Sequence, residues 1–140
     1  RPWSRARFEQ TGLTRLIVTG ATMITYIDPE ARYSDATIHN GIIYLGGQVP
    51  EDASADAAAQ TRSVLVQIDA LLARCGSDKA HILEATIYLA DLGDYDAMNR
   101  IWDGWTAPGR APARACVQAR LAHPGWKVEI KLTAVQKSTT

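Results

Sequence analysis

The sequence predicts an α+β fold in which two helices cover one face of a mixed β-sheet. Three observations predict this class: a hairpin signal near residue 40, two stretches with helical periodicity, and alternating strand patterns toward the C-terminus. With 140 residues, the chain is long enough for one domain with a substantial core and too short for two.

The first strands are predicted around Asn40-Gly41, which separates two apolar, β-branched runs at 37–39 and 42–45. Both central residues of a two-residue hairpin turn need a positive φ, and this dipeptide adopts it readily. Gly46-Gly47 follows the second strand. Because two adjacent residues lack a Cβ, another group can approach the backbone closely there.

The next segment, 57–75, changes to the period of an amphipathic helix. Ser54 or Asp56 can cap its start, and Gly76 stands where a left-handed residue ends a helix. Its apolar positions are Val64, Ile68, Leu71, Leu72 and Cys75.

A strand is predicted at 82–90, which is rich in β-branched and aromatic residues. Asp94 is expected to cap a second helix that stops at Pro108-Gly109. The apolar stripe of this helix holds Tyr95, Met98, Trp102 and Trp105. At this spacing, the tryptophan pair is expected to fill a core or an interface rather than form a ligand platform.

Two more strands are predicted at 114–119 and 126–135, where residues alternate between two faces. Ala115 and Val117 share one face of the first strand, while Arg114 and Cys116 share the other. The sheet face away from the helices is expected to carry polar and small residues. Self-association is the simplest way to cover such a face.

The first 22 residues differ from the rest, since four arginines are scattered among Pro, Trp and Gly without a clear period. A more regular pattern begins at Met23. We therefore predict an N-terminal extension at 1–22 and the folded domain at 23–140.

Composition argues against several classes of protein. Lysine plus arginine and aspartate plus glutamate number 15 each, so no net charge recruits nucleic acid or an acidic membrane surface. No apolar run approaches the roughly 18 to 20 residues of a membrane span. Cys75 and Cys116 have neither zinc-ligand nor redox-motif spacing, and two free thiols favour a reducing compartment. We expect a cytoplasmic protein.

No metal is expected. Asp91, Asp94 and Asp96 resemble the start of a calcium loop, but the loop glycine and the terminal glutamate are missing. The three histidines have no ligand spacing. Helix capping explains the aspartates adequately.

The informative constellation joins Arg114, Cys116 and Glu129. Arg114 and Cys116 point the same way on a strand, and Glu129 alternates out of the apolar set of the last strand, so it can face the same cleft. A guanidinium fork suits a planar carboxylate, and a glutamate can activate water. A structural Arg–Glu pair at a subunit interface explains the same residues equally well, and both readings stay open on chemistry alone.

From about residue 33 to 135, the chain resembles the RidA/YjgF family, also known for the endoribonuclease L-PSP-like fold. The matching segments, in order and with family spacing, are 42–50, 60–61, 91–99, 112–117 and 127–130. The tryptophans of the second helix resemble those of the YoaB-like branch. The resemblance implies a chorismate-mutase-like homotrimer with clefts between subunits. It also implies a cofactor-free hydrolase acting on C–N bonds, a deaminase that converts 2-imino acids or their enamine tautomers into 2-oxo acids and ammonia.

The same resemblance implies roles for single residues. Arg114 matches the arginine that clamps the substrate carboxylate, and Glu129 matches the glutamate that positions or activates water. Gly47 matches a glycine whose backbone borders the imine.

Four further positions belong to the implied substrate site. Tyr33 matches an aromatic wall, Asn99 a cleft asparagine, and Cys116 a cysteine that lines the site. Gly46 stands where many members have serine, so a hydroxyl contact is missing here. Ala31-Arg32 replaces the common Gly-Pro, which leaves the shape of the entrance loop open.

Two other functions are weighed against hydrolysis. A non-catalytic trimer that senses 2-oxo acids would use the same Arg114, but it would gain nothing from Glu129. Ribonuclease activity or translation inhibition, attached to some relatives, is disfavoured by the balanced charge and the lack of a basic, aromatic surface.

Overall fold

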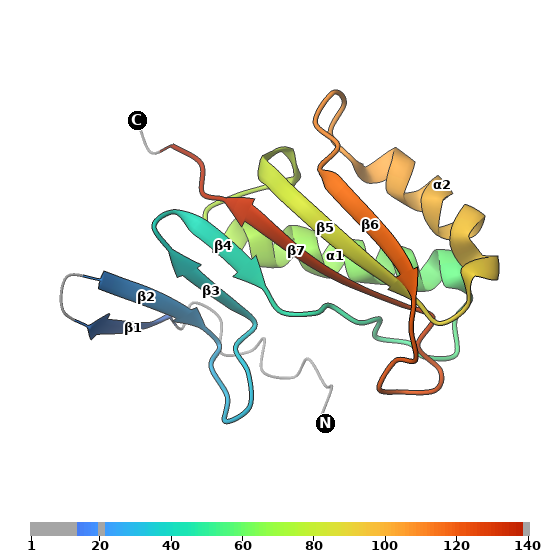
Figure 1. The fold of residues 1–140 in the computed structure, drawn as a ribbon, viewed down its shortest axis with the longest axis horizontal. Helices are drawn as coiled ribbons and strands as arrows, with labels where there is room; N and C mark the ends of the chain where they lie inside the picture. The colour runs from blue at the N-terminus through green and yellow to red at the C-terminus, as the bar shows by residue number, and fades with distance from the viewer. Residues whose placement is uncertain (1–13, 20–21, 139–140) are drawn as a thin grey trace.

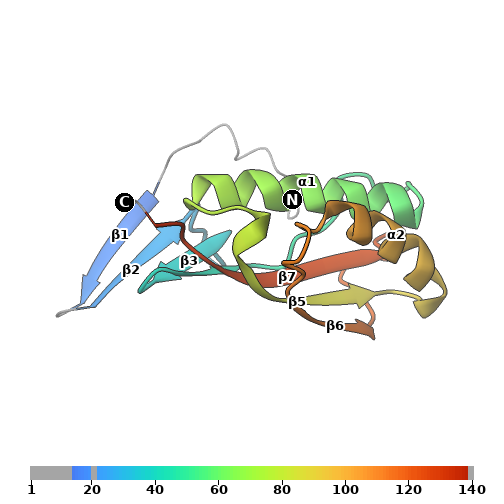
Figure 2. The same ribbon diagram turned by 90° about the horizontal axis from the view of Figure 1, so that it is seen from above.

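The computed structural model describes residues 14–19 and 22–138, in which a seven-stranded mixed sheet carries two α-helices on one face (Figures 1 and 2). The strands are β1 (Thr14–Thr19), β2 (Thr22–Ile27), β3 (Ala36–His39), β4 (Ile42–Leu45), β5 (Ile82–Leu89), β6 (Ala113–Gln118) and β7 (Val128–Val135). The helices are α1 (Ala57–Arg74) and α2 (Tyr95–Trp105), with short 3-10 turns at Lys79–His81 and Leu92–Asp94.

The strand order is β1-β2-β3-β4-β7-β5-β6. β5 and β6 run parallel, and the other neighbouring strands are antiparallel. The α2 helix crosses between the two parallel strands, as such a connection requires. The predicted α+β class, with helices on one face of a mixed sheet, is confirmed.

The predicted hairpin is present, because Asn40 and Gly41 have φ values of 52° and 77° between β3 and β4. Positive φ at both positions matches the twist of the flanking strands. The chain leaves β4 at Leu45 and returns to the sheet at Gln48, which bridges Ile130 of β7. Gly46 and Gly47 therefore lie between two points where the backbone is held by the sheet.

Helix ends follow the sequence signals with one exception. Asp56 accepts a hydrogen bond from the backbone N–H of Ala59, and Gly76 has a φ of 80° after α1. Asp94 precedes α2 but makes no side-chain capping bond there. Asp91 accepts from the Gly93 N–H instead, so the cap serves the 3-10 turn that leads into α2.

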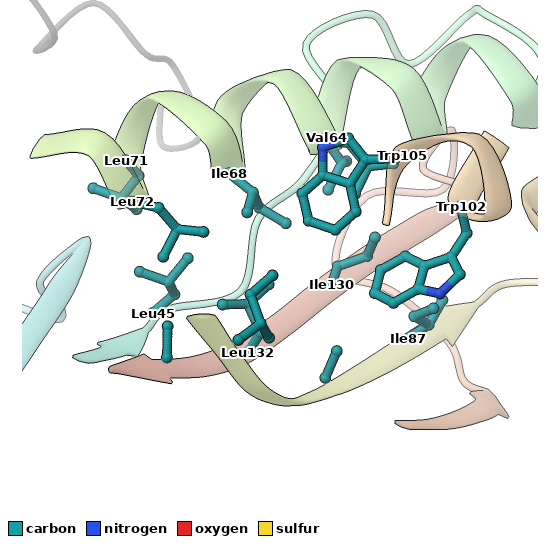
Figure 3. Packing of buried hydrophobic residues seen from close by; sticks show 14 of the residues in the cluster. Leu45, Val64, Ile68, Leu71, Leu72, Ile87, Trp102, Trp105, Ile130 and Leu132 are labelled. Atoms are coloured by element: carbon teal, nitrogen blue, oxygen red, sulfur yellow. The ribbon is translucent and has the colours of Figure 1, made fainter. Parts of the chain in front are cut away.

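The core lies between the helices and the sheet (Figure 3). The buried face of α1, which includes Val64, Ile68 and Leu72, packs over Ile130 and Leu132 of β7. Each such side chain contributes about 1.5 to 3 kcal/mol when fully buried. In the described residues, neither helix is long and apolar enough to cross a membrane.

Buried α2 residues join this core from the side of β5 and β6. Trp102 and Trp105 are buried with Met98, and the two indole rings lie 5.4 Å apart. The Trp105 Nε1 donates to both carboxylate oxygens of Asp69 on α1, at 3.2 and 3.1 Å. The expectation that the tryptophans fill a core is therefore confirmed.

Strand β1 lies within the predicted extension at 1–22 and pairs with β2 at the edge of the sheet. The boundary predicted at residue 23 stays a prediction. Residues 1–13 and 20–21 of the extension lie outside the described residues.

Candidate functional site

Arg114 on β6 is held by three side chains of α2. Its Nη1 donates to Asn99 Oδ1 at 2.8 Å, and its Nη2 donates to the Tyr95 hydroxyl at 3.3 Å. The guanidinium carbon also lies 5.6 Å from the centroid of the Trp102 ring and 5.9 Å from that of Tyr95. Hydrogen bonds and cation–π contacts therefore orient the charged group of a half-buried arginine.

Tyr95 and Trp102 are contacts of Arg114 that the sequence interpretation missed. They were assigned to an apolar stripe, yet they stand four residues before and three residues after Asn99. Residues at these offsets share one face of a helix. The helical spacing around the family asparagine could therefore have identified both as neighbours of the arginine.

Cys116 lies two residues beyond Arg114 on the same strand and packs against the core cluster. Burial raises the pKa of its thiol, and the nearby Arg114 charge offsets this only in part. The other free cysteine, Cys75, is buried at the end of α1, where desolvation raises its pKa to about 11. Both thiols stay protonated near neutral pH, so neither is an activated nucleophile.

Glu129 on β7 adjoins Gly47. A Cβ added to Gly47 would overlap the Glu129 Oε2 and lie 3.0 Å from the Cδ. The glycine therefore makes room for the carboxylate. Burial raises the pKa of Glu129 above its ordinary value, since desolvation disfavours the charged form.

A cavity of about 660 Å³ begins beside Gly46. Its lining includes Tyr33 from the segment before β3, together with Tyr26, Tyr44 and Lys131. Tyr33 and Gly46, both predicted to bind substrate, therefore lie together. They stand on the Glu129 side of the molecule, because Gly46 is directly joined to Gly47.

The strand register separates these residues into two groups. Arg114 pairs with Ala85 and Cys116 pairs with Ile87, and both partners are buried in the core under the helices. Glu129 pairs with Tyr88, one residue further along β5. Because paired residues share a face and successive residues alternate, Arg114 and Glu129 lie on opposite faces of the sheet.

The expectation that Arg114 and Glu129 face one cleft is therefore wrong for a single chain. One group, on the helix side at the β6 edge, contains Arg114, Asn99 and Cys116. The other group, on the open face, contains Tyr33, Gly46, Gly47 and Glu129. Within the described part of the chain, no group of three or more His, Cys, Asp or Glu side chains is arranged to hold a metal ion.

Comparisons with known proteins give consistent matches. The family model described as endoribonuclease L-PSP matches residues 23–136. A RutC family protein of Haemophilus ducreyi is 56% identical over 112 residues, which cover 80% of this chain and 96% of that protein. The RutC family protein YoaB of Escherichia coli K12 is 54% identical over 111 residues, covering 79% and 96%.

The solved structures agree. NMB1025 of Neisseria meningitidis, described as a member of the YjgF protein family, matches with a TM-score of 0.80 and 59% identity. The match covers 83% of this chain and 97% of that one. The matched part of the chain runs from β2 past the end of β7 and contains every residue of both groups.

Proposed function

Because this chain belongs to the YjgF/RutC family, the family that the sequence resemblance named, we propose that it is an imine deaminase that hydrolyses 2-imino acids. The products are a 2-oxo acid and ammonia. Enamine tautomers are hydrolysed after they convert to the imine. The substrate carries a carboxylate next to an electrophilic C=N carbon. A site for this reaction needs a cation for the carboxylate and a base for water.

The observation that carries the proposal is the orientation of the Arg114 guanidinium. Among the described contacts, two of its five N–H groups donate, to Asn99 and Tyr95. The remaining donors can form a fork for a carboxylate. Such a charge-assisted hydrogen bond contributes about 1.5 to 3 kcal/mol.

Glu129 supplies the base. The ionised carboxylate accepts a proton from water as the water oxygen attacks the carbon of the protonated imine, which gives a neutral carbinolamine. Glu129 then passes this proton to the amine nitrogen. The C–N bond breaks as the C=O bond forms, Glu129 takes the hydroxyl proton, and ammonia leaves. A raised pKa suits this role, because it brings the carboxyl group closer to the pH at which it must exchange protons.

Cys116 is not needed as a nucleophile. Burial keeps its thiol protonated, and water rather than the protein attacks the carbon. Its proximity to Arg114 makes it part of the wall of the carboxylate site.

Each site requires two chains under this proposal. Arg114 and Glu129 of one chain lie on opposite faces of a sheet and cannot both reach one small substrate. An interface between two different surfaces is heterologous and closes into a ring when the rotation permits. We therefore expect a homotrimer in which the β6 edge of one subunit meets the open face of the next.

Mixing two inactive variants tests the proposal directly. Arg114→Ala and Glu129→Ala should each abolish hydrolysis of imines that an amino-acid oxidase generates, with semicarbazide used to trap the unreacted imine. In trimers assembled from equal amounts of both variants, about one quarter of the sites combine an intact Arg114 from one subunit with an intact Glu129 from the next. Activity should therefore return to about one quarter of the wild-type value.

Light scattering must show that each variant keeps the oligomeric state of the unmodified protein. Loss of assembly by Arg114→Ala would favour the structural Arg–Glu pair instead. Full activity of either single variant would refute its assigned role. No recovery in verified mixed trimers would refute the division of the site between chains.

A non-catalytic sensor of 2-oxo acids would bind its ligand through the same Arg114. Tight binding of a 2-oxo acid without turnover of any imine would favour that function. The description of the family model as an endoribonuclease suggests RNA cleavage, but the formal net charge of zero offers no field for a polyanion.

A further inference from the structure

A row of side chains on α2 leads from the Arg114 guanidinium toward the other helix. Asn99, Trp102 and Trp105 stand three residues apart, so they share one face of α2. Arg114 contacts the first two, through a hydrogen bond to Asn99 and a cation–π contact with Trp102. Trp105 continues the row away from the arginine. In Figure 3, its ring lies toward α1, and the Trp102 ring lies toward β5.

The Trp105 ring is held both at its edge and at its face. Its Nε1 donates to the two carboxylate oxygens of Asp69 on α1, at 3.2 and 3.1 Å. The Nζ of Lys79, in the 3-10 turn before β5, lies 5.6 Å from the ring centroid. An aromatic ring has a positive edge and a negative face, so the carboxylate and the ammonium each meet the part of the indole that attracts them. Two elements outside α2 therefore fix this ring.

The position of Trp105 limits how Trp102 can turn. Their ring centroids lie 5.4 Å apart, their planes are inclined by 44°, and both side chains are buried. Buried side chains are close-packed, so one ring cannot turn far without displacing the other. The orientation of Trp102 therefore depends on where Trp105 is held.

The orientation of Trp102 matters to Arg114, because the attraction between them is directional. The guanidinium carbon lies 5.6 Å from the centroid of the Trp102 ring. The face of an indole attracts a cation and its edge does not, so a turned ring would no longer support the guanidinium. The hydrogen bonds to Asn99 and Tyr95 would then have to orient the charged group without the ring beside it.

We infer that Asp69 is a positioning residue for Arg114, which acts through Trp105 and Trp102 and makes the contact between α1 and α2 part of the carboxylate clamp. The inference rests on the proposed function, in which Arg114 binds the substrate carboxylate. Asp69 is exposed on α1 and belongs to neither group of site residues. Its effect on the reaction should therefore come only from the direction in which Arg114 points.

Removing the Asp69 carboxylate tests the inference and leaves every core side chain in place. Asp69→Ala should raise the KM for a 2-imino acid, and the Kd for the stable 2-oxo acid pyruvate, by about three- to tenfold, a typical effect of a change within a chain of contacts. Because the clamp holds the carboxylate both before and during the reaction, kcat should change by less than about twofold. A loss of folded protein would instead lower kcat and leave KM unchanged.

Two variants serve as matched controls. Asp69→Asn keeps a carbonyl oxygen that can accept the Trp105 N–H, so its KM and Kd should stay within about twofold of those of the unmodified protein. Asp103→Ala on α2 removes an exposed carboxylate that makes no hydrogen bond or ion pair within the described part of the chain, and it should leave both constants unchanged. An equal rise of KM in Asp103→Ala would assign the effect to charge alone and overturn the inference.

The NMR resonance of the Arg114 Nε–H gives a readout that does not depend on hydrolysis. This resonance, identified by its absence from Arg114→Lys, should shift in Asp69→Ala and stay in place in Asp69→Asn. Unchanged KM and Kd values in Asp69→Ala would overturn the inference and leave the hydrolase proposal intact. If the unmodified protein neither hydrolyses an imine nor binds pyruvate, the proposed function fails and the resonance alone decides: a shift supports the positioning of Arg114, and an unmoved resonance refutes it.

Discussion

Replacing Gly47 with alanine would place a methyl group where the Glu129 carboxylate lies. The new Cβ would overlap Oε2 and stand 3.0 Å from Cδ and 3.4 Å from Cγ. Gly47 is not among the residues with positive φ, so alanine does not strain the backbone. The perturbation therefore acts on the glutamate side chain.

The size of the effect follows from these contacts. Carbon atoms pack at about 3.5 to 4.0 Å, so the carboxyl carbon must move by about 0.5 to 1 Å and its oxygen further. A misplacement of about 1 Å at a catalytic group lowers the rate by about 100-fold. Turning the glutamate off its preferred rotamer costs only about 0.5 to 1.5 kcal/mol, so the fold should persist.

We expect Gly47→Ala to lower kcat/KM for imine hydrolysis by about 100-fold while urea unfolding changes by about 1 kcal/mol or less. Gly104→Ala is the matched control. A Cβ at Gly104 on α2 meets nothing within 4 Å, and alanine should stabilise the helix by about 0.5 to 1 kcal/mol without affecting activity. A Gly47→Ala protein with kcat/KM within about twofold of the control would refute the contact with Glu129 as a basis of catalysis.

Three further predictions concern the site and the fold. Arg114→Lys should lower kcat/KM by about 10- to 100-fold, because one ammonium cannot form the fork while bonding Asn99; unchanged kinetics would contradict the fork. Activity that depends on Glu129 should fall as the pH drops through its raised pKa. Because burial disfavours the ionised carboxylate, Glu129→Gln should raise the free energy of unfolding at neutral pH. Below about pH 4.5 it should not, since the carboxyl group is then protonated in both the folded and the unfolded protein. Urea titrations at neutral pH and below about pH 4.5 measure this difference. Gln60→Ala should lower the free energy of unfolding by about 2 to 3 kcal/mol, because the buried amide accepts from the Lys127 N–H and donates to three carbonyls; an unchanged urea midpoint would contradict this.

Local signals predicted most of the secondary structure. The Asn40-Gly41 turn, the cap at Asp56 and the αL residue at Gly76 depend on backbone preferences of a few neighbouring residues, so the sequence specifies them directly. The capping role of Asp94 was wrong because Asp91 three residues earlier competes for the same turn. Residue order alone does not show which of two nearby carboxylates accepts the hydrogen bond from a backbone N–H of the turn.

The site residues were identified by their resemblance to a family rather than by their chemistry. Arg114 and Asn99 were both named, and the structure joins them through a hydrogen bond of 2.8 Å. Tyr95 and Trp102 were placed on an apolar stripe, because their apolar character does not distinguish a core residue from one that stacks on a cation. Their offsets from Asn99 were the signal that the interpretation did not use.

Which residues share a face on each strand follows from the order of residues alone, since side chains alternate with a period of two. This alternation separated Arg114 and Cys116 from Ala115 and Val117 correctly. Which of these faces lies under the helices depends on how the strands pair and where the helices pack. The parallel pairing of β6 with β5 and the position of α2 turn Arg114 toward the helices and Glu129 away from them. Pairing between strands is a long-range interaction, so alternation within one strand carries no information about it.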